Sequence, residues 1–179
     1  MEWKENDEKS CFYSISENYD EDKRTYGYDL DCTLFSKGGI DPLYILSEGK
    51  LKGNVVIFTN QHGIEKGKTT HKEVRKRAKE LLKYHDNITF FYSTKKDRFR
   101  KPHTGMYSLF VSKMDSEIHL DFYCGDAAGR KGDFASTDLF FAQNIGLDFK
   151  TENLKDFNKF KPNGMEKYIG DKNPNTFID

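Results

Sequence analysis

Four short runs of apolar and aromatic residues divide the chain, and each stops abruptly at a polar or charged group. Runs of this length are typical of buried strands in a parallel sheet. In open α/β proteins the carboxyl ends of such strands carry the ligand-binding side chains. We therefore predict strands over residues 25–30, 54–58, 88–92 and 120–124, followed by Asp31, Thr59, Ser93 and Gly125-Asp126.

A helical repeat lies between the second and third predicted strands. Thr70 and Glu73 form the T-x-x-E pattern of a capping box, which satisfies free amides at a helix start. Apolar residues follow at helical spacing, so the stretch predicts a helix that buries Val74, Ala78, Leu81 and Leu82. Two more helices are expected, one from Thr104 with Met106, Leu109, Phe110 and Met114 inward, and one over 136–144 that Gly146 ends.

Strands that alternate with helices predict an α/β fold with a doubly wound, Rossmann-like parallel sheet. The length of 179 residues matches a single domain. We expect an acidic N-terminal segment over 1–22, the domain over 23–170, and a C-terminal tail over 171–179.

Charge is balanced overall, with 29 basic and 29 acidic side chains, but it is unevenly distributed. Residues 1–22 hold two lysines and eight acids, a net charge of 2 − 8 = −6. Residues 66–101 hold thirteen basic and four acidic side chains, a net charge of 13 − 4 = +9. The basic stretch indicates a phosphate-rich ligand, although a solvated helix face would also account for its helical part.

The three cysteines, Cys11, Cys32 and Cys124, have no C-x-x-C spacing and predict neither a disulfide framework nor a zinc site. The first residues are charged, and no apolar stretch approaches the roughly 20 residues of a membrane span. We expect an intracellular protein of the cytoplasm or nucleus, neither secreted nor membrane-bound, and a monomer.

Asp29 and Asp31 lie two residues apart at the end of the first predicted strand. Carboxylates this close repel each other unless a cation lies between them. A magnesium ion would resolve the repulsion, and it would leave one aspartate free to attack phosphorus and the other to handle a proton. An acid-rich surface turn is the alternative for this pair taken alone.

The other predicted strand ends and a nearby lysine carry matching chemistry. Thr59 and Asn60 offer a hydroxyl and an amide to phosphate oxygens, Lys101 offers a positive charge, and Asp126 adds a third carboxylate. Each of these could also be a polar turn or a solvated side chain. Together, and in this order, they indicate a magnesium-dependent phosphatase.

The order and spacing of these motifs resemble the haloacid dehalogenase superfamily. Longer strings resemble the phosphatase domain of polynucleotide kinase 3′-phosphatase, and they span about residues 27–150. The strings are GYDLDCTL at 27–34, VIFTNQHGI at 56–64, RKPHTGM at 100–106, CGDAAGR at 124–130, KGDFASTD at 131–138 and FAQNIGL at 141–147.

The resemblance implies a haloacid dehalogenase-type domain with little or no cap, and roles for particular residues. Asp29 would attack phosphorus to form an aspartyl-phosphate, and Asp31 would protonate the leaving 3′ oxygen and later activate water. Mg²⁺ would bind the Asp29 carboxylate, the Asp31 backbone carbonyl and Asp126. Thr59 and Lys101 would hold the phosphoryl oxygens. The expected substrate contacts are Thr33, Asn60, Gln61, Arg100 and Arg130, although Arg130 could instead bind Asp133 or Asp138.

The substrate implied is a 3′-terminal phosphate at DNA ends or breaks, with removal leaving a 3′-hydroxyl for DNA repair; RNA ends remain an alternative. Basic side chains at 95, 96, 98, 100 and 101 could hold the nucleic-acid backbone, and Phe99 could stack on a base or belong to the core. The alternatives are a histidinol- or sugar-phosphate phosphatase of the same superfamily, whose usual Cys/His zinc loop this chain lacks, and a non-catalytic module that binds nucleic-acid ends.

Three sequence details qualify the resemblance. Cys32 stands where most members of the family have glycine. Because cysteine carries a side chain, it restricts the backbone at this position. The stretch between Arg130 and Asp133 is shorter than the usual loop of the family. The segment GIEKGKT at 63–69 is one residue short of a P-loop, so we expect no ATP site.

Overall fold

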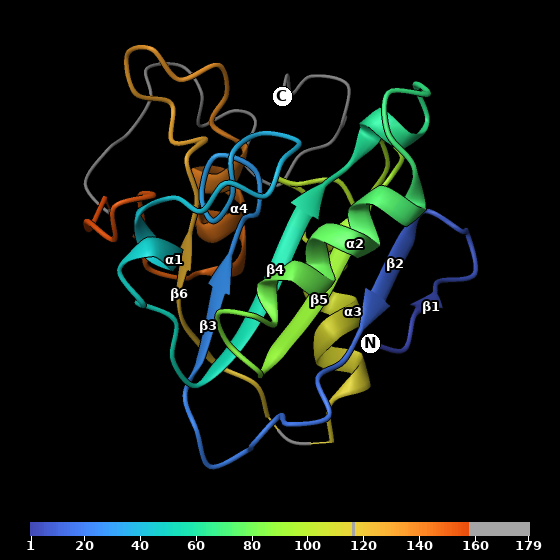
Figure 1. Ribbon diagram of the computed structural model, residues 1–179, viewed down its shortest axis with the longest axis horizontal. Coiled ribbons are helices and arrows are strands. Elements are labelled where there is room, and N and C mark those ends of the chain that lie inside the picture. The colour runs from blue at the N-terminus through green and yellow to red at the C-terminus, as the bar shows by residue number, and fades with distance from the viewer. Residues whose placement is uncertain (116, 158–179) are drawn as a thin grey trace.

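The computed structural model describes residues 1–115 and 117–157, which form one seven-stranded sheet in the order β1-β2-β5-β4-β3-β6-β7 (Figure 1). Five neighbouring strands, from β5 to β7, are parallel, whereas β1 and β2 are antiparallel to their neighbours. The strands are β1 (Lys4–Glu5), β2 (Cys11–Ser14), β3 (Thr25–Tyr28), β4 (Asn54–Asn60), β5 (Ile88–Ser93), β6 (Leu120–Cys124) and β7 (Phe149–Lys150).

Helices cover both faces of the sheet, which confirms the doubly wound α/β prediction. The helices are α1 (Tyr44–Ser47), the 3-10 helix η1 (His62–Ile64), α2 (His71–Leu81), α3 (Gly105–Lys113) and α4 (Thr137–Ile145). Buried residues of α1 and α2 belong to one apolar cluster, and those of α3 and α4 belong to a second. In Figure 1, α2 crosses in front of the sheet, and α3 lies behind it.

Strand β4 shows why the strands are apolar on both faces. Val55 and Ile57 pack into the cluster with α1 and α2, whereas Val56 and Phe58 pack into the cluster with α3 and α4. Side chains alternate between the faces of a strand, so a strand covered on both sides needs a continuous apolar run. The run at 54–58 therefore predicted this strand correctly, and pairing with β5 extends it to Asn60.

The chain reverses its direction of travel across the sheet at β3. From β3 it proceeds through β4 to β5 on one side, and later returns to place β6 and β7 on the other. Ligands of open α/β sheets bind outside the carboxyl ends of the strands at such a reversal. The fold thus places a binding crevice beyond the ends of β3 and β6.

Residues 1–22 contribute two strands that the sequence analysis did not predict. β2 pairs with β5 over four residues, from Cys11 opposite Ser93 to Ser14 opposite Phe90. Trp3 adds edge-to-face contacts with Phe90 and Tyr92. The segment lacks a long apolar run, so only its pairing with β5 reveals it as part of the sheet.

The helix predictions hold, apart from one position. Thr70 caps α2 by accepting a hydrogen bond from the Glu73 amide at 3.1 Å, and Gly146 ends α4 in the left-handed conformation. The prediction that Leu82 is buried is wrong, because α2 ends at Leu81 and Leu82 is 36% exposed.

No described helix is long and apolar enough to cross a membrane. The predicted tail at 171–179 lies outside the described residues.

Candidate active site

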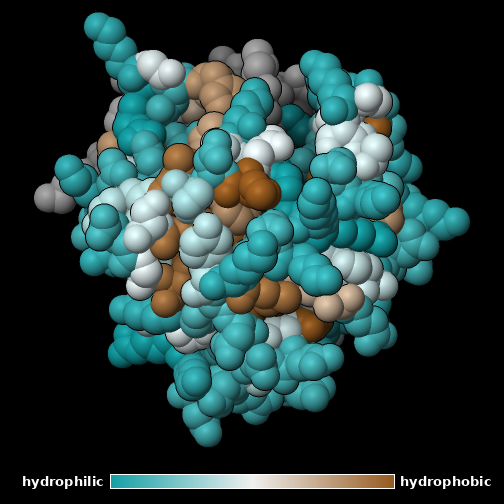
Figure 2. Space-filling model, viewed as in Figure 1, coloured by the Kyte–Doolittle hydropathy of each residue, from teal (hydrophilic) through white to brown (hydrophobic). Residues whose placement is uncertain are grey.

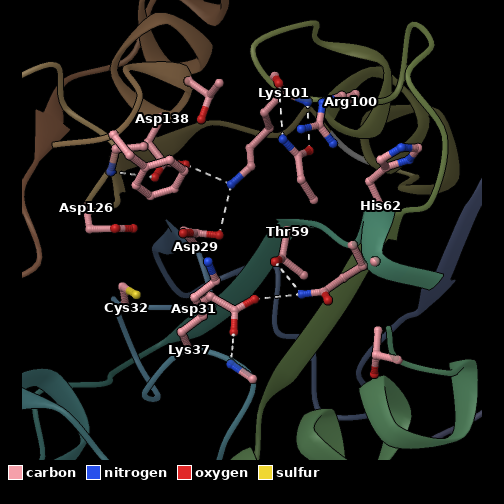
Figure 3. A pocket seen from close by; sticks show the side chains of 18 of the residues that line it. Asp29, Asp31, Cys32, Lys37, Thr59, His62, Arg100, Lys101, Asp126 and Asp138 are labelled. Carbon is pink, nitrogen blue, oxygen red and sulfur yellow. Dashed lines mark hydrogen bonds and ion pairs between the residues drawn. The ribbon is translucent and has the colours of Figure 1, made fainter. Parts of the chain in front are cut away.

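A pocket of about 370 Å³ lies beyond the carboxyl ends of β3, β4 and β6, where the strand order reverses. Its volume falls in the range of pockets that bind small ligands. Most of the predicted site residues line it, although they are far apart in the sequence. They are Asp29, Asp31, Thr59, Asn60, Gln61, Arg100, Lys101 and Asp126 (Figure 3).

Asp29 and Lys101 form a buried ion pair at the floor of this pocket. Lys101 Nζ lies 2.9 Å from Asp29 Oδ1 and 2.7 Å from Asp138 Oδ1, between the two carboxylates (Figure 3). The Tyr123 hydroxyl lies 2.9 Å from the same nitrogen. Lys101 is only 2% exposed, so its ammonium is held in one position rather than hydrated.

Burial and charge act in opposite directions on these two residues. Burial raises the pKa of Asp29 well above its usual value, and the neighbouring Asp138 carboxylate adds to this, while Lys101 opposes it. Burial by itself lowers the pKa of Lys101, but Asp138 and Asp29 outweigh burial and raise it. Lys101 is therefore a permanent cation beside a carboxylate that ionises reluctantly without further positive charge.

Three carboxylates gather at this point of the pocket. Oxygen atoms of Asp29, Asp126 and Asp138 all lie within 4.8 Å of one another. Burial, followed by the charge of Asp138, raises the pKa of Asp126 to about 7. Clustered carboxylate oxygens are the donor set that Mg²⁺ prefers, so these residues fit that ion.

The three carboxylates are not equally available to a metal. Asp138 Oδ1 binds Lys101, and its Oδ2 accepts a hydrogen bond from the Ala127 amide at 3.0 Å. Asp126 receives one from the Thr33 hydroxyl at 3.3 Å, which leaves much of its carboxylate open to the pocket. Asp29 and Asp126 are therefore the better ligands, and Asp138 is better placed to orient Lys101.

Asp31 faces a different set of partners from Asp29. Its Oδ1 accepts hydrogen bonds from Arg77 at 2.6 Å and from the Gly38 amide at 2.8 Å, and its Oδ2 accepts one from Gln61 at 2.9 Å. The two aspartates therefore each face a cation of the protein, Lys101 for Asp29 and Arg77 for Asp31. The sequence analysis expected a single cation between them and did not identify Arg77.

Thr59, Asn60 and Gln61 form the β4 side of the pocket. The Gln61 amide donates to Thr59 Oγ1 at 3.0 Å as well as to Asp31, so it aligns both side chains. Asn60 accepts from the Lys101 amide at 2.9 Å and donates to the Lys101 carbonyl at 3.1 Å. Asn60 thus fixes the backbone of Lys101, and because it also lines the pocket, its contact with substrate stays a prediction.

Thr33 and Arg130 do not line the pocket. Thr33 is fully buried and reaches it only through Asp126. Arg130 binds Asp133 at 2.8 Å and Glu152 at 3.0 Å, and it also donates to the Asp126 carbonyl at 3.0 Å. Of the two interpretations of Arg130, the geometry therefore favours the structural tie to Asp133 over substrate contact.

Two further sequence hypotheses are decided by the geometry. Phe99 is 3% exposed and packs in the cluster beneath α3, so it belongs to the core rather than to a base-stacking surface. Cys32 has a φ of +62°, in the left-handed region that glycine adopts easily. A residue with a side chain is disfavoured in this conformation, as the resemblance to the family led us to expect for Cys32.

Asp138 and Tyr123 were missed as site residues because nothing in their local sequence marks them. Asp138 lies in the first turn of α4, where an acidic residue is a common feature of helices. A side chain at Gly125 would collide with the Asp138 carboxyl group. Gly125 therefore leaves room for Asp138 to approach Lys101. This glycine is the one sequence signal that could have pointed to Asp138 as a site residue.

The strand order and the position of the pocket define a fold of the haloacid dehalogenase type. The structure is similar to D,D-heptose 1.7-bisphosphate phosphatase from B. bronchiseptica, crystallised with magnesium and phosphate, with a TM-score of 0.56 and 16% identity. The match covers 72% of this chain and 79% of that one. At this identity the likeness establishes the fold alone.

A model of the polynucleotide kinase 3 phosphatase family matches residues 31–154, and the chain belongs to that family. It is 37% identical over 151 residues to the bifunctional polynucleotide phosphatase/kinase of Schizosaccharomyces pombe, covering 72% of this chain and 36% of the relative. It is 40% identical over 94 residues to the polynucleotide 3′-phosphatase of Saccharomyces cerevisiae, covering 42% and 40%. The chain thus spans well under half the length of both relatives.

Proposed function

We propose that the chain is a magnesium-dependent polynucleotide 3′-phosphatase that acts on 3′-phosphate ends of DNA during repair. One observation carries the proposal above all. The pocket places Asp29 and Lys101 in contact, with Asp126 beside them, at the topological switch point of the sheet. Family membership supports the choice of substrate.

Asp29 acts as the nucleophile in this proposal. Its carboxylate oxygen forms a bond to phosphorus, and the bond from phosphorus to the 3′ oxygen breaks. Asp31 gives a proton to the departing 3′ oxygen, which becomes the 3′-hydroxyl. Water then attacks the aspartyl-phosphate, Asp31 takes a proton from that water, and inorganic phosphate leaves.

Positive charge and hydrogen-bond donors stabilise the phosphoryl group. Lys101 contributes a fixed positive charge, because Asp138 and Tyr123 hold it in place, and Thr59 contributes a hydroxyl aligned by Gln61. A bound Mg²⁺, held by Asp29, Asp126 and the Asp31 carbonyl, would neutralise part of the phosphate charge and polarise the phosphorus–oxygen bonds.

The rim of the pocket supports a nucleic-acid substrate. Lys37, Lys66 and Lys68 are exposed and line it in addition to the central residues. A polyanion leading into the site would meet these cations, whereas a small sugar phosphate would need few of them. We propose DNA ahead of RNA as the substrate, a monomeric enzyme without an ATP site, and action inside the cell, in the nucleus or cytoplasm.

The decisive experiment measures phosphate release with Mg²⁺ from a 3′-phosphorylated oligonucleotide, its 5′-phosphorylated counterpart, and histidinol and sugar phosphates. We expect release from the 3′-phosphorylated substrate alone, and its loss in Asp29→Asn. Release only from the small molecules would support the small-molecule phosphatase instead. DNA-end binding by the wild type, with no hydrolysis beyond that of Asp29→Asn, would support the binding module.

A further inference from the structure

The exposed face of α2 carries a stripe of positive charge that no step of the proposed reaction uses. Lys72, Arg75, Lys76 and Lys79 follow one another at helical spacing along 11 residues of helix. Lys72, Lys76 and Lys79 are exposed, and within residues 1–115 and 117–157 none of the three forms an ion pair with a carboxylate. The α2 stripe, as we call these four residues, lies on the face shown in Figure 2, which is mostly hydrophilic.

The α2 stripe works against the stability of its own helix. Lys72/Lys76 and Arg75/Lys79 are like-charged pairs four residues apart, which repel each other on a helix surface. Lys72 also lies in the first turn, where the helix dipole disfavours positive charge. Glu73 and Glu80 also lie on α2, but among the described residues Glu80 pairs with Lys83 and neither forms an ion pair with the stripe, so the four cations stay available to an anionic ligand.

An aromatic side chain lies beside the stripe. Trp3 lines a shallow groove together with Met1 and the four basic residues of α2. The Arg75 guanidinium stacks over the Trp3 ring at 5.1 Å, which restrains it on the surface. Basic side chains interleaved with an aromatic ring are typical of surfaces that bind single-stranded nucleic acid.

The α2 stripe begins close in sequence to residues that line the candidate active site. Lys66, Lys68 and Thr69 line the pocket, and α2 begins only two residues later, at His71. The helix descends from the carboxyl edge of the sheet across its face (Figure 1). A strand whose 3′ end enters the pocket can therefore leave it along α2.

The route past the end of β5, which the basic residues at 95–101 suggested, is less suitable. The Arg98 guanidinium is paired with Glu8 at 2.9 Å, so its charge is already balanced. Lys101 is buried in the active site, and Phe99 lies in the core. Of that cluster, only Lys95 and Lys96 are exposed cations without an ion pair among the described residues.

We propose that the α2 stripe holds the sugar-phosphate backbone of the strand that carries the 3′-phosphate, a few nucleotides before its end. This inference rests on the proposed function for the position of the 3′ end. The seven-residue step from Lys72 to Lys79 corresponds to about 10 Å along the helix, which is the length of about three nucleotides. A dinucleotide would fill the pocket without extending along the stripe, whereas a longer strand would contact it.

The test compares a 3′-phosphorylated dinucleotide with a 3′-phosphorylated single-stranded 12-mer. In Lys72→Gln/Lys76→Gln/Lys79→Gln we expect KM for the 12-mer to rise about tenfold or more at low salt, with kcat unchanged. The dependence of log kcat/KM on log salt should become shallower by about 2 for this substrate, since each phosphate contact contributes about 0.7. Kinetic constants for the dinucleotide should stay the same.

The matched control is Lys23→Gln/Lys50→Gln/Lys52→Gln, which removes three exposed lysines that precede the amino ends of β3 and β4. An equal effect of this control on the 12-mer would attribute the change to net charge and overturn the inference. Unchanged 12-mer kinetics in the α2 variant would also overturn it. If the wild type hydrolyses neither substrate, the proposed function fails, and fluorescence anisotropy with the 12-mer then decides whether the stripe binds it.

Discussion

Lys101 Nζ lies 2.9 Å from Asp29 Oδ1, although 72 positions separate the two residues in the sequence. Asp29 follows strand β3, and Lys101 comes from the connection between β5 and α3. Both residues are buried, so little water competes for the ion pair. The pair therefore links the candidate nucleophile to a charge that its phosphoryl substrate would also contact.

Replacing Lys101 with methionine should remove this charge while preserving most of the side-chain volume. We expect kcat on a 3′-phosphorylated oligonucleotide to fall by about 10²–10³, the usual effect of losing a preorganised electrostatic contact. The free energy of unfolding should fall by about 3 kcal/mol, because the buried carboxylates lose their partner. Steady-state kinetics and urea unfolding measure the two effects, with exposed Lys23→Met as the control. A Lys101→Met enzyme of wild-type kcat would contradict the role given to Lys101.

Asp126 and Asp138 should respond differently to substitution, since only Asp126 is proposed to hold the metal. Asp126→Asn is expected to raise the Mg²⁺ concentration needed for half-maximal activity by about tenfold or more. Asp138→Asn should lower kcat without a comparable change in that concentration, because it disturbs Lys101. Magnesium titrations of phosphate release separate the two variants. A larger shift in the Mg²⁺ requirement for Asp138→Asn would make Asp138 the ligand.

Without metal, stability should fall with rising pH because of Asp126. Its pKa is about 7 in the folded protein, against a reference value of 3.8. Between these values the folded state binds more protons than the unfolded state, so stability decreases as pH rises. Thermal unfolding in chelator should show Asp126→Asn gaining Tm relative to the wild type from pH 4 to pH 7.

Magnesium should act on this pH dependence in the opposite sense. An ion that binds the ionised carboxylate stabilises the folded state most where that carboxylate has lost its proton. We therefore expect Mg²⁺ to raise the Tm of the wild type more at pH 8 than at pH 6, and to have little effect on Asp126→Asn. An equal Mg²⁺ effect at both pH values would argue against Asp126 as a ligand.

Cys32→Gly should stabilise the protein. The φ of +62° is unfavourable for a residue with a side chain by about 1–2 kcal/mol, whereas glycine loses about 0.5–1 kcal/mol through backbone entropy. The net gain in the free energy of unfolding should be about 0.5–1 kcal/mol, measured by urea unfolding under reducing conditions. Cys32→Ala is the matched control, because it removes the thiol but keeps the Cβ atom, and it should show no gain.

The sequence by itself determined the fold class, the central strands and the main helices. Apolar runs such as 54–58 specify a strand that is covered on both faces, and the capping box at Thr70 specifies a helix start, because both signals depend on residues close together in the chain. Motif order also placed Asp29, Lys101 and Asp126 at one edge of the sheet, since parallel strands end on the same side.

Only the tertiary structure decided which charges face each other. Arg77 binds Asp31 and Asp138 binds Lys101 across distances of 46 and 37 residues, and neither local sequence differs from an ordinary helix surface or helix start. The strand β2 likewise depends on pairing with β5, and Arg130 is held by Asp133 and Glu152. These contacts form between segments that the fold brings together, so their energies depend on geometry that no local pattern of residues contains.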